Sequence, residues 1–194
     1  MTLLETPKTI MKKIIFVTGN IHKVREADEI LSEAGIIVEQ NNCGYPELQE
    51  DDLQPIAVFG AKWASDKLKN EIMVDDSGLF IEALNGFPGP YSAYVADTLG
   101  NERILKLMEN ETNRSAIFKC VIGYCCPWEE PVIFTGVVKG EIARSSRGNN
   151  GFGYDPIFEV EGITFGEMTE EMKNMLSHRY QALLKFRQWL LEKT

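Results

Sequence analysis

Short apolar runs alternate with segments of helical periodicity along this chain, and that alternation restricts its fold more than any other feature. The run KKIIFVT at residues 12–18 has the length and composition of a buried strand, and Gly19 and Asn20 end it. Apolar side chains then recur at helical spacing as far as Gly35, and a second apolar run follows at residues 36–40. A strand, a helix and a second strand in this order indicate an α/β protein.

The rest of the chain continues this mixture of elements. Pro55 in a first turn predicts a helix over residues 55–70. Residues 115–126 and 131–143 have strand composition with a short turn-forming segment between them, which predicts an antiparallel pair. The other expected elements are a strand over 71–78, short helices over 92–99, 101–109 and 169–175, a closing helix over 178–192, and loops over 85–90 and 145–156.

Length and composition are those of a globular protein with a sizeable core. The chain has 194 residues, of which 44% are hydrophobic and 25% are charged. No run reaches the ~20 apolar residues of a membrane span, and the first residues lack the apolar region of a signal peptide. We therefore expect a cytoplasmic protein without a membrane partner, with an N-terminal tail over residues 1–12 and a single domain over residues 13–194.

The net charge of −9 limits the partners that the chain can bind. It argues against a nucleic-acid polymer, which requires a basic surface. A small anionic ligand is compatible with it if local cations, backbone N–H groups or a metal ion meet the ligand's charge. The four cysteines include no CxxC pair, so reduced thiols in the core are favoured over a zinc site.

The segment TGNIHK, from Thr18 to Lys23, lies where the first strand passes into a helix. The start of a helix presents free N–H groups and a partial positive charge, which suit phosphate, and Lys23 adds a full charge. Gly19 permits a close backbone approach or a positive φ. The alternative is an ordinary strand-to-helix turn in which Asn20 caps the helix.

The segment VDDSG places two carboxylates, Asp75 and Asp76, at the expected exit of a buried strand. Ligands bind at such strand ends in open α/β sheets, and carboxylates suit Mg²⁺. Because strand side chains alternate, the two carboxylates are expected on opposite faces, with Ser77 and Gly78 forming a turn of close approach. The alternative is a solvated turn in which these side chains bond the local backbone.

The glycine-rich segment GFGYDP, from Gly151 to Pro156, carries two aromatic rings and an acid. A mobile loop of this kind can stack a nucleobase on Phe152 or Tyr154 and accept a hydrogen bond from the base at Asp155. The alternative is a hinge loop whose aromatic rings lie in the core. The sequence leaves both interpretations open.

The segment EEMKNMLSHR brings Lys173, His178 and Arg179 into a chain that has few cations. Ser177 is suited to cap the last helix, so His178 and Arg179 fall in its first turn. Cations there oppose the helix dipole, which an anionic or carbonyl-bearing ligand would explain. The alternative is a solvated helix start.

Together these four segments are similar to the inosine triphosphate pyrophosphatases, also called Ham1-like proteins, and occur in the order of that family. The segments YPELQ and GVVKGEI are closest to archaeal members. The resemblance implies an elongated mixed β-sheet flanked by helices, with two lobes and a central substrate cleft. It also implies Mg²⁺-dependent hydrolysis of ITP, dITP and XTP to the monophosphate and pyrophosphate, by a homodimer.

The resemblance also implies individual roles. Asp76 matches the metal-binding and general-base residue, and Glu47 matches a second metal ligand. Lys62 matches a lysine that precedes the acidic strand, although its spacing to Asp76 is shorter here than in bacterial members. The implied substrate-binding residues are Thr18, Gly19, Asn20, Ile21, His22, Lys23, Lys62, Ser77, Phe152, Gly153, Tyr154, Asp155, Lys173, His178 and Arg179.

Two other functions remain as alternatives. One is a nucleotide-binding regulator without catalysis, which the presence of both Glu47 and Asp76 disfavours. The other is a phosphatase that removes the terminal phosphate of ordinary nucleotides. We expect the protein to distinguish its substrates from ATP at the 6-position of the purine. A 6-keto group accepts a hydrogen bond from His178 or Arg179, whereas the 6-amino group of adenine leaves these donors unpaired.

Overall fold

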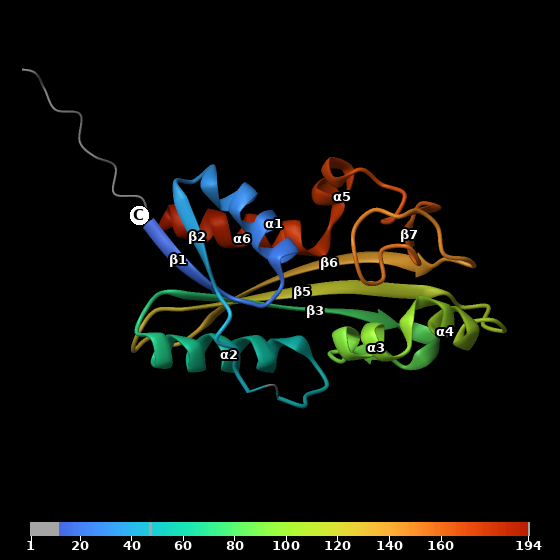
Figure 1. Ribbon diagram of the computed structural model, residues 1–194, viewed down its shortest axis with the longest axis horizontal. Helices are drawn as coiled ribbons and strands as arrows, with labels where there is room; N and C mark the ends of the chain where they lie inside the picture. Colours follow the sequence, from blue (N-terminus) through green and yellow to red (C-terminus); the bar gives the residue numbers. More distant parts are fainter. Residues whose placement is uncertain (1–11, 47, 194) are drawn as a thin grey trace, which may run out of the picture.

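The computed structural model describes residues 12–46 and 48–193, which form one eight-stranded sheet with helices on both faces (Figure 1). The strands are β1 (Lys12–Val17), β2 (Ile36–Asn41), β3 (Ile72–Ile81), β4 (Pro88–Gly89), β5 (Ser115–Cys125), β6 (Val132–Ile142), β7 (Phe158–Val160) and β8 (Ile163–Thr164). The helices are α1 (Ile21–Ser32), α2 (Leu53–Leu68), the 3₁₀ helix η1 (Glu82–Leu84), α3 (Ser92–Thr98), α4 (Gly100–Leu107), α5 (Glu170–Leu176) and α6 (His178–Glu192).

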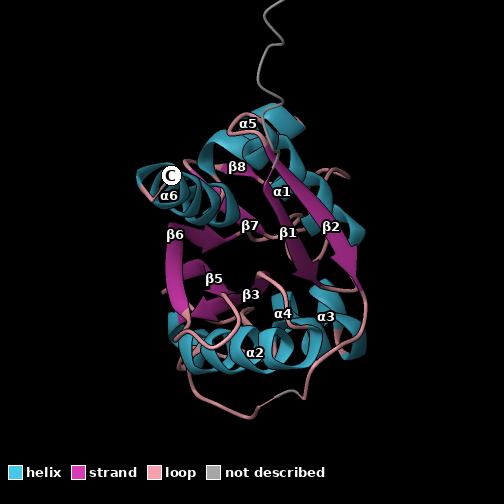
Figure 2. Ribbon diagram, turned by 90° about the vertical axis from the view of Figure 1, so that its left-hand side faces the viewer, coloured by secondary structure: helices cyan, strands magenta, loops and turns pink. Residues whose placement is uncertain are grey.

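The sheet is mixed and elongated. Its order is β2-β1-β3-β5-β6-β7-β8, with β4 paired to β3. The first strand β1 is parallel to β2 and β3, whereas β5 is antiparallel to both β3 and β6. Figure 2 shows α1, α5 and α6 on one face of the sheet and α2, α3 and α4 on the other. This architecture confirms the expected fold class.

The hydrophobic core has three parts because helices cover the long sheet in three places. One part packs α1 and α6 on the sheet and includes Phe16 and Phe186, and a second packs α2 on the sheet around Ala57 and Val74. The third fills the distal end around Phe165. The long strands β3 and β5 contribute to all three parts, which makes the sheet one continuous support for the site between them.

Two strand glycines allow helices to approach the sheet closely. A Cβ atom at Gly136 of β6 would lie 1.9 Å from the carbonyl oxygen of His178 in α6. A Cβ atom at Gly123 of β5 would lie 2.4 Å from the carbonyl oxygen of Ala57 in α2. Both positions require glycine for steric reasons, and Gly136 thereby sets the position of the first turn of α6.

Most elements occur where the sequence predicts them, with three corrections. The strand β3 continues to Ile81, so Ser77 and Gly78 are part of the strand and do not form the expected turn. The short strands β4, β7 and β8 and the 3₁₀ helix η1 are not predicted from the sequence, and β4 lies in the segment 85–90 that is expected to be a loop. Lys12 begins β1 and is not part of a tail, while the remainder of the expected tail lies outside the described residues.

No helix in residues 12–46 or 48–193 has the length and apolar character needed to span a membrane.

Candidate active site

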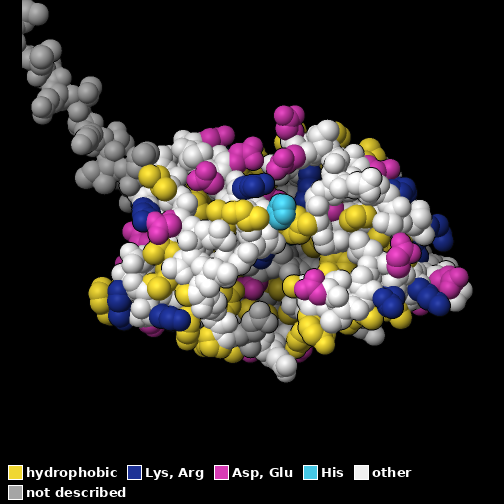
Figure 3. Space-filling model, in the orientation of Figure 1, with side chains coloured by type: hydrophobic (Ala, Val, Ile, Leu, Met, Phe, Trp, Pro, Cys, Tyr) yellow, Lys and Arg dark blue, Asp and Glu magenta, His cyan; other side chains and the backbone are white. Residues whose placement is uncertain are grey.

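Two cavities meet at the start of α1, and Figure 3 shows this face of the molecule hollowed near its middle. The first, here called the carboxylate cavity, has a volume of about 680 Å³ and is lined by residues that include Thr18, Gly19, Lys23, Tyr45, Asp75, Asp76 and Ser77. The second, here called the aromatic cavity, has a volume of about 510 Å³ and is lined by residues that include His22, Glu26, Phe152 and Lys173.

Strand β3 sends its two neighbouring carboxylates to opposite faces of the sheet, as alternation predicts. The carboxylate of Asp75 accepts hydrogen bonds from Lys23 of α1 and Arg179 of α6. The half-buried carboxylate of Asp76 accepts from the Tyr45 hydroxyl, which lies 3.1 Å from Oδ2. The two acids therefore have different neighbours and different chemical environments.

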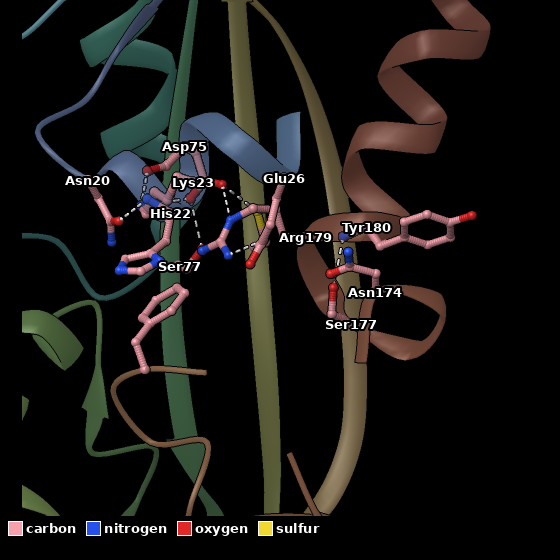
Figure 4. Close-up of polar contacts among 12 residues, drawn as sticks. Asn20, His22, Lys23, Glu26, Asp75, Ser77, Asn174, Ser177, Arg179 and Tyr180 are labelled. Carbon is pink, nitrogen blue, oxygen red and sulfur yellow. Dashed lines mark hydrogen bonds and ion pairs between the residues drawn. The ribbon is translucent and has the colours of Figure 1, made fainter. Parts of the chain in front are cut away.

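Asp75 lies at the centre of a buried network of charges (Figure 4). Arg179 Nε donates to Asp75 Oδ2 at 2.7 Å, and Lys23 Nζ lies 2.8 Å from Asp75 Oδ1. The Ser77 hydroxyl donates to Asp75 Oδ1 at 2.8 Å, and Arg179 Nη1 pairs with Glu26 at 2.6 Å. Burial alone would raise the pKa of Asp75, but the charges of Arg179 and Lys23 outweigh it and hold this pKa well below its ordinary range.

The turn between β1 and α1 has the expected N-cap. The Asn20 side chain accepts from the His22 N–H at 2.9 Å, and the Thr18 hydroxyl accepts from the Asn20 N–H at 3.1 Å. A Cβ atom at Gly19 would lie 3.1 Å from the side-chain oxygen of Asn42, so the absence of a side chain at Gly19 lets Asn42 lie close to the backbone. The first turn of α1 contains no acidic residue, which leaves its N-terminal partial charge available to an anion.

The structure divides the TGNIHK segment between the two cavities. Thr18, Gly19 and Lys23 line the carboxylate cavity, whereas His22 lines the aromatic cavity and stacks on Phe152 with 5.4 Å between ring centroids. Asn20 serves the cap, and the Ile21 side chain is exposed. Only part of this segment is therefore placed to contact phosphate groups.

The glycine-rich loop presents one of its two aromatic rings to the site. The Phe152 ring lies 4.8 Å from Lys173 Nζ, in cation–π contact. The Tyr154 ring is instead buried in the core, and its hydroxyl donates to the Ser92 carbonyl oxygen at 2.8 Å. Tyr154 is therefore not placed to stack on a base. Its ring lies in the core, which is the alternative interpretation of this loop.

The acid of this loop fixes the loop's shape. Asp155 is buried, and it accepts from the Phe152 N–H at 2.7 Å and from Lys173 Nζ at 2.7 Å. Burial raises the pKa of Asp155, and the Lys173 charge opposes that rise. The Gly153 carbonyl oxygen accepts from Asn101 at 2.9 Å, which ties the loop to the start of α4.

The start of α6 carries His178 and Arg179, with Ser177 as the N-cap. The His178 ring stacks on Phe118 with 4.3 Å between centroids, and its Nδ1 atom has no hydrogen-bond partner within the described part of the chain. Burial, followed by the Arg179 charge, lowers the pKa of His178 well below its ordinary value. His178 is neutral, and Arg179 is paired with two acids. The expected repulsion between these two side chains and the positive end of the helix dipole is therefore removed.

Several residues implied by the resemblance line neither cavity, among them Lys62, His178 and Arg179. Lys62 donates to the Glu129 carbonyl oxygen at 3.0 Å, in the turn between β5 and β6, and lies 3.9 Å from Asp66. On α2 it lies about 2.5 helical turns from Leu53 and about 1.7 turns from Ile56, the residues of this helix that line the carboxylate cavity. Glu47 lies outside the described residues.

Two residues at the site were missed by the sequence analysis. Glu26 pairs with Arg179. Its spacing of three residues from Lys23 places both side chains on one face of α1, and this spacing could have identified it from the sequence. Tyr45 contacts Asp76 from the loop that follows β2, and no local pattern identifies it.

The donor set of the carboxylate cavity fits a divalent cation that is completed by water and phosphate. No group of three His, Cys, Asp or Glu side chains able to hold a metal is present among residues 12–46 and 48–193. Mg²⁺ needs only one or two protein carboxylates when a phosphate supplies the other oxygens. Lys23, Lys173 and Arg179 are each paired with a carboxylate already, so their charges are largely neutralised. A phosphate chain in the cavity would therefore require a further positive charge.

The open mixed sheet, the helix start beside a carboxylate and the adjoining aromatic cavity define an α/β protein with a nucleotide-sized cleft. The chain belongs to the Ham1 family, whose sequence model matches residues 14–189.

Relatives and solved structures agree with this assignment. The dITP/XTP pyrophosphatase of Methanosarcina mazei is 59% identical over 181 residues, which cover 93% of this chain and 98% of the relative. The protein of the same name from Methanopyrus kandleri is 56% identical over 179 residues, covering 91% and 95%. The Ham1 protein structure from Staphylococcus aureus superimposes with a TM-score of 0.84 at 32% identity, over 94% of this chain and 100% of that one. The expected family and the likeness to archaeal members are confirmed.

Proposed function

We propose that the protein hydrolyses dITP, ITP and XTP to the nucleoside monophosphate and pyrophosphate. The observation that carries this proposal is the junction at the start of α1. A carboxylate cavity for the phosphate chain and an aromatic cavity for the base meet there at Lys23 and His22. The names of the relatives, dITP/XTP pyrophosphatase, support the choice of substrate.

The proposed reaction is the attack of water on the α-phosphorus. A bond forms from the water oxygen to this phosphorus, the bond to the bridging oxygen breaks, and pyrophosphate leaves. Asp76 accepts the proton of the attacking water, because its half-buried carboxylate faces the cavity. Thr18, Gly19 and Lys23, which line this cavity at the start of α1, contact the phosphate oxygens. Ser77 contributes its hydroxyl beside them.

Mg²⁺ is the proposed cofactor, with Asp76 as one ligand and Glu47, by family resemblance, as the second. When bound, it neutralises phosphate charge and lowers the pKa of bound water. The described charged residues that line the carboxylate cavity are Lys23, Asp75 and Asp76. Because Lys23 is already paired with Asp75, a phosphate chain needs a further positive charge, and this need supports the proposal of a metal ion.

The base is proposed to stack on Phe152 and to be selected at its 6-position. A 6-keto purine accepts a hydrogen bond from the neutral imidazole of His178, whose Nδ1 is without a partner in the described part of the structure. The 6-amino group of adenine cannot accept, so this buried group would stay unpaired, a difference worth roughly 10⁴-fold. Lys173 and Arg179 lie under the Phe152 ring and support its position.

Two further properties complete the proposal. We infer a homodimer from the family resemblance, and we propose the cytoplasmic location that the sequence analysis expects. Light scattering tests the homodimer, and a monomer at micromolar concentration would contradict it. A regulator without catalysis and a terminal phosphatase remain the alternative functions.

One product assay separates the three functions. The protein is incubated with Mg²⁺ and each of ITP, dITP, XTP, GTP and ATP, and the products are resolved. We expect monophosphate and pyrophosphate from ITP, dITP and XTP. Orthophosphate as the first product, or equal rates on ATP, would overturn the proposal, and no turnover would favour the regulator.

A further inference from the structure

The helix α2 contains a glycine in its interior, at a position where glycine weakens a helix relative to alanine. This residue, Gly60, is buried on the side of the helix that carries Ala57, Ala61 and Ala64. Alanine would continue that small-residue pattern and favour the helix. The presence of glycine therefore needs a steric reason.

The steric reason is the ring of Tyr45. A Cβ atom at Gly60 would lie 2.7 Å from Cε2 and 2.8 Å from Cζ of Tyr45, distances that Cβ atoms essentially never show. The ring therefore lies directly against the backbone of α2. Any side chain at residue 60 would move the ring away from the helix.

The position of the ring determines where the Tyr45 hydroxyl lies. This hydroxyl is 3.1 Å from Oδ2 and 3.3 Å from Oδ1 of Asp76. The contact links the loop after β2 to the middle of β3, and both residues line the carboxylate cavity. A donor close to both carboxylate oxygens fixes the rotation of the carboxylate, which a metal ligand or a general base requires.

We propose that Tyr45 is a positioning residue for Asp76, and that Gly60 is glycine because it leaves room for the Tyr45 ring. This inference rests on the proposed function, since it assigns Asp76 to the chemistry. Tyr45 acts on the orientation of Asp76 and not on substrate affinity. Its loss therefore lowers kcat and leaves KM nearly unchanged.

The test is a double-mutant cycle with Tyr45→Phe, Gly60→Ala and the double variant, assayed with dITP and Mg²⁺. We expect Tyr45→Phe to lower kcat by about 10-fold or more, as for the loss of a hydrogen bond to a charged group, with KM within about 2-fold. Gly60→Ala lowers kcat through displacement of the ring. It has no further effect on kcat in the Tyr45→Phe background, where the hydroxyl is already absent.

The matched control is Tyr180→Phe, which removes a hydroxyl that donates no hydrogen bond to the described residues. It should keep the kcat of the unchanged protein. A Tyr45→Phe variant with unchanged kcat would overturn the inference. So would a Gly60→Ala effect of equal size in both backgrounds, since that effect would act through the helix alone.

A binding measurement separates this inference from the proposed function. Thermal unfolding is followed as Mg²⁺ is added to the unchanged protein and to Tyr45→Phe. We expect a smaller rise in melting temperature for Tyr45→Phe, because the Asp76 carboxylate loses the hydroxyl that orients it and binds the ion less well. An equal rise would overturn the role of Tyr45, whereas a protein without pyrophosphatase activity would overturn only the proposed function.

Discussion

Arg179 Nε lies 2.7 Å from the carboxylate of Asp75, and the two side chains are only 3% and 1% exposed. The pair connects the start of α6 with the middle of β3, across 104 residues of sequence. Lys23 and Glu26 of α1 join the same network. These contacts hold α1, β3 and α6 together at the point where the two cavities meet.

Substitution of Asp75 should destabilise the fold. Asp75→Asn leaves the buried Arg179 paired with Glu26 alone, and removal of one partner of a buried ion pair costs about 3–5 kcal/mol. We expect a loss of this order in the free energy of unfolding, measured by urea denaturation. Asp76→Asn is the control, and its half-buried position predicts a change below about 1 kcal/mol. Equal stability of Asp75→Asn and the unchanged protein would contradict the role of the network.

Turnover should depend on Asp76. Asp76→Asn keeps the size of the side chain but removes the base and the metal-binding charge, so hydrolysis of dITP should be abolished while circular dichroism stays unchanged. The comparison requires Asp75→Asn under conditions where it is folded. If Asp76→Asn stays active and folded Asp75→Asn does not, the wrong carboxylate has been assigned to the chemistry.

Stability should fall as the pH drops from 6.5 towards 5 because of His178. Its pKa is lowered in the folded state by burial and then by Arg179, with Asp75, Lys173 and Lys23 as the other charges that act on it. Below about pH 6.5 the unfolded chain takes up a proton that the folded chain refuses, so stability decreases by up to about 1.4 kcal/mol per pH unit. Above pH 6.5 the contribution is constant.

The measurement for this pH effect is urea denaturation at several pH values between 5 and 8. His178→Gln removes the titrating ring, so this variant should lack most of the slope between pH 5 and 6.5. A slope that is the same in both proteins would show that another group carries it.

A side chain at Gly136 should impair base selection. Gly136→Ala places a Cβ atom 1.9 Å from the His178 carbonyl oxygen and 2.7 Å from the Ala182 nitrogen, which forces the start of α6 to move. We expect the ratio of kcat/KM for dITP to that for dATP to fall by about 10-fold or more, because the position of His178 changes. Gly123→Ala is the control, since its clash is with α2. Both variants should lose stability, but an equal loss of selectivity would contradict the prediction.

The two lysines implied as substrate contacts should differ in effect. Lys23→Met removes the cation of the carboxylate cavity, and kcat/KM for dITP should fall by about 10- to 100-fold. Lys62→Met removes a contact to the Glu129 carbonyl oxygen and should change kcat/KM by less than about 2-fold. A large effect of Lys62→Met would show that Lys62 reaches the substrate in a state that differs from this structure.

The sequence by itself determined the order and type of the long elements. Strands β1, β2, β5 and β6 and helices α1, α2 and α6 follow from local periodicity, caps and turn residues, which act over a few positions. It also determined the family, because four segments with specific residues occur in one order. The opposite placement of Asp75 and Asp76 follows from strand alternation alone.

Only the tertiary structure decided which partner each polar group meets. Asp75 meets Lys23 and Arg179 because α1 and α6 pack on the same face of the sheet, and the contact across 104 residues leaves no local signal. The same packing puts Tyr154 in the core and Phe152 in the aromatic cavity, although both rings lie in one short loop. Ion pairing and desolvation depend on groups that are distant in sequence, so they emerge only when the sheet and helices are assembled.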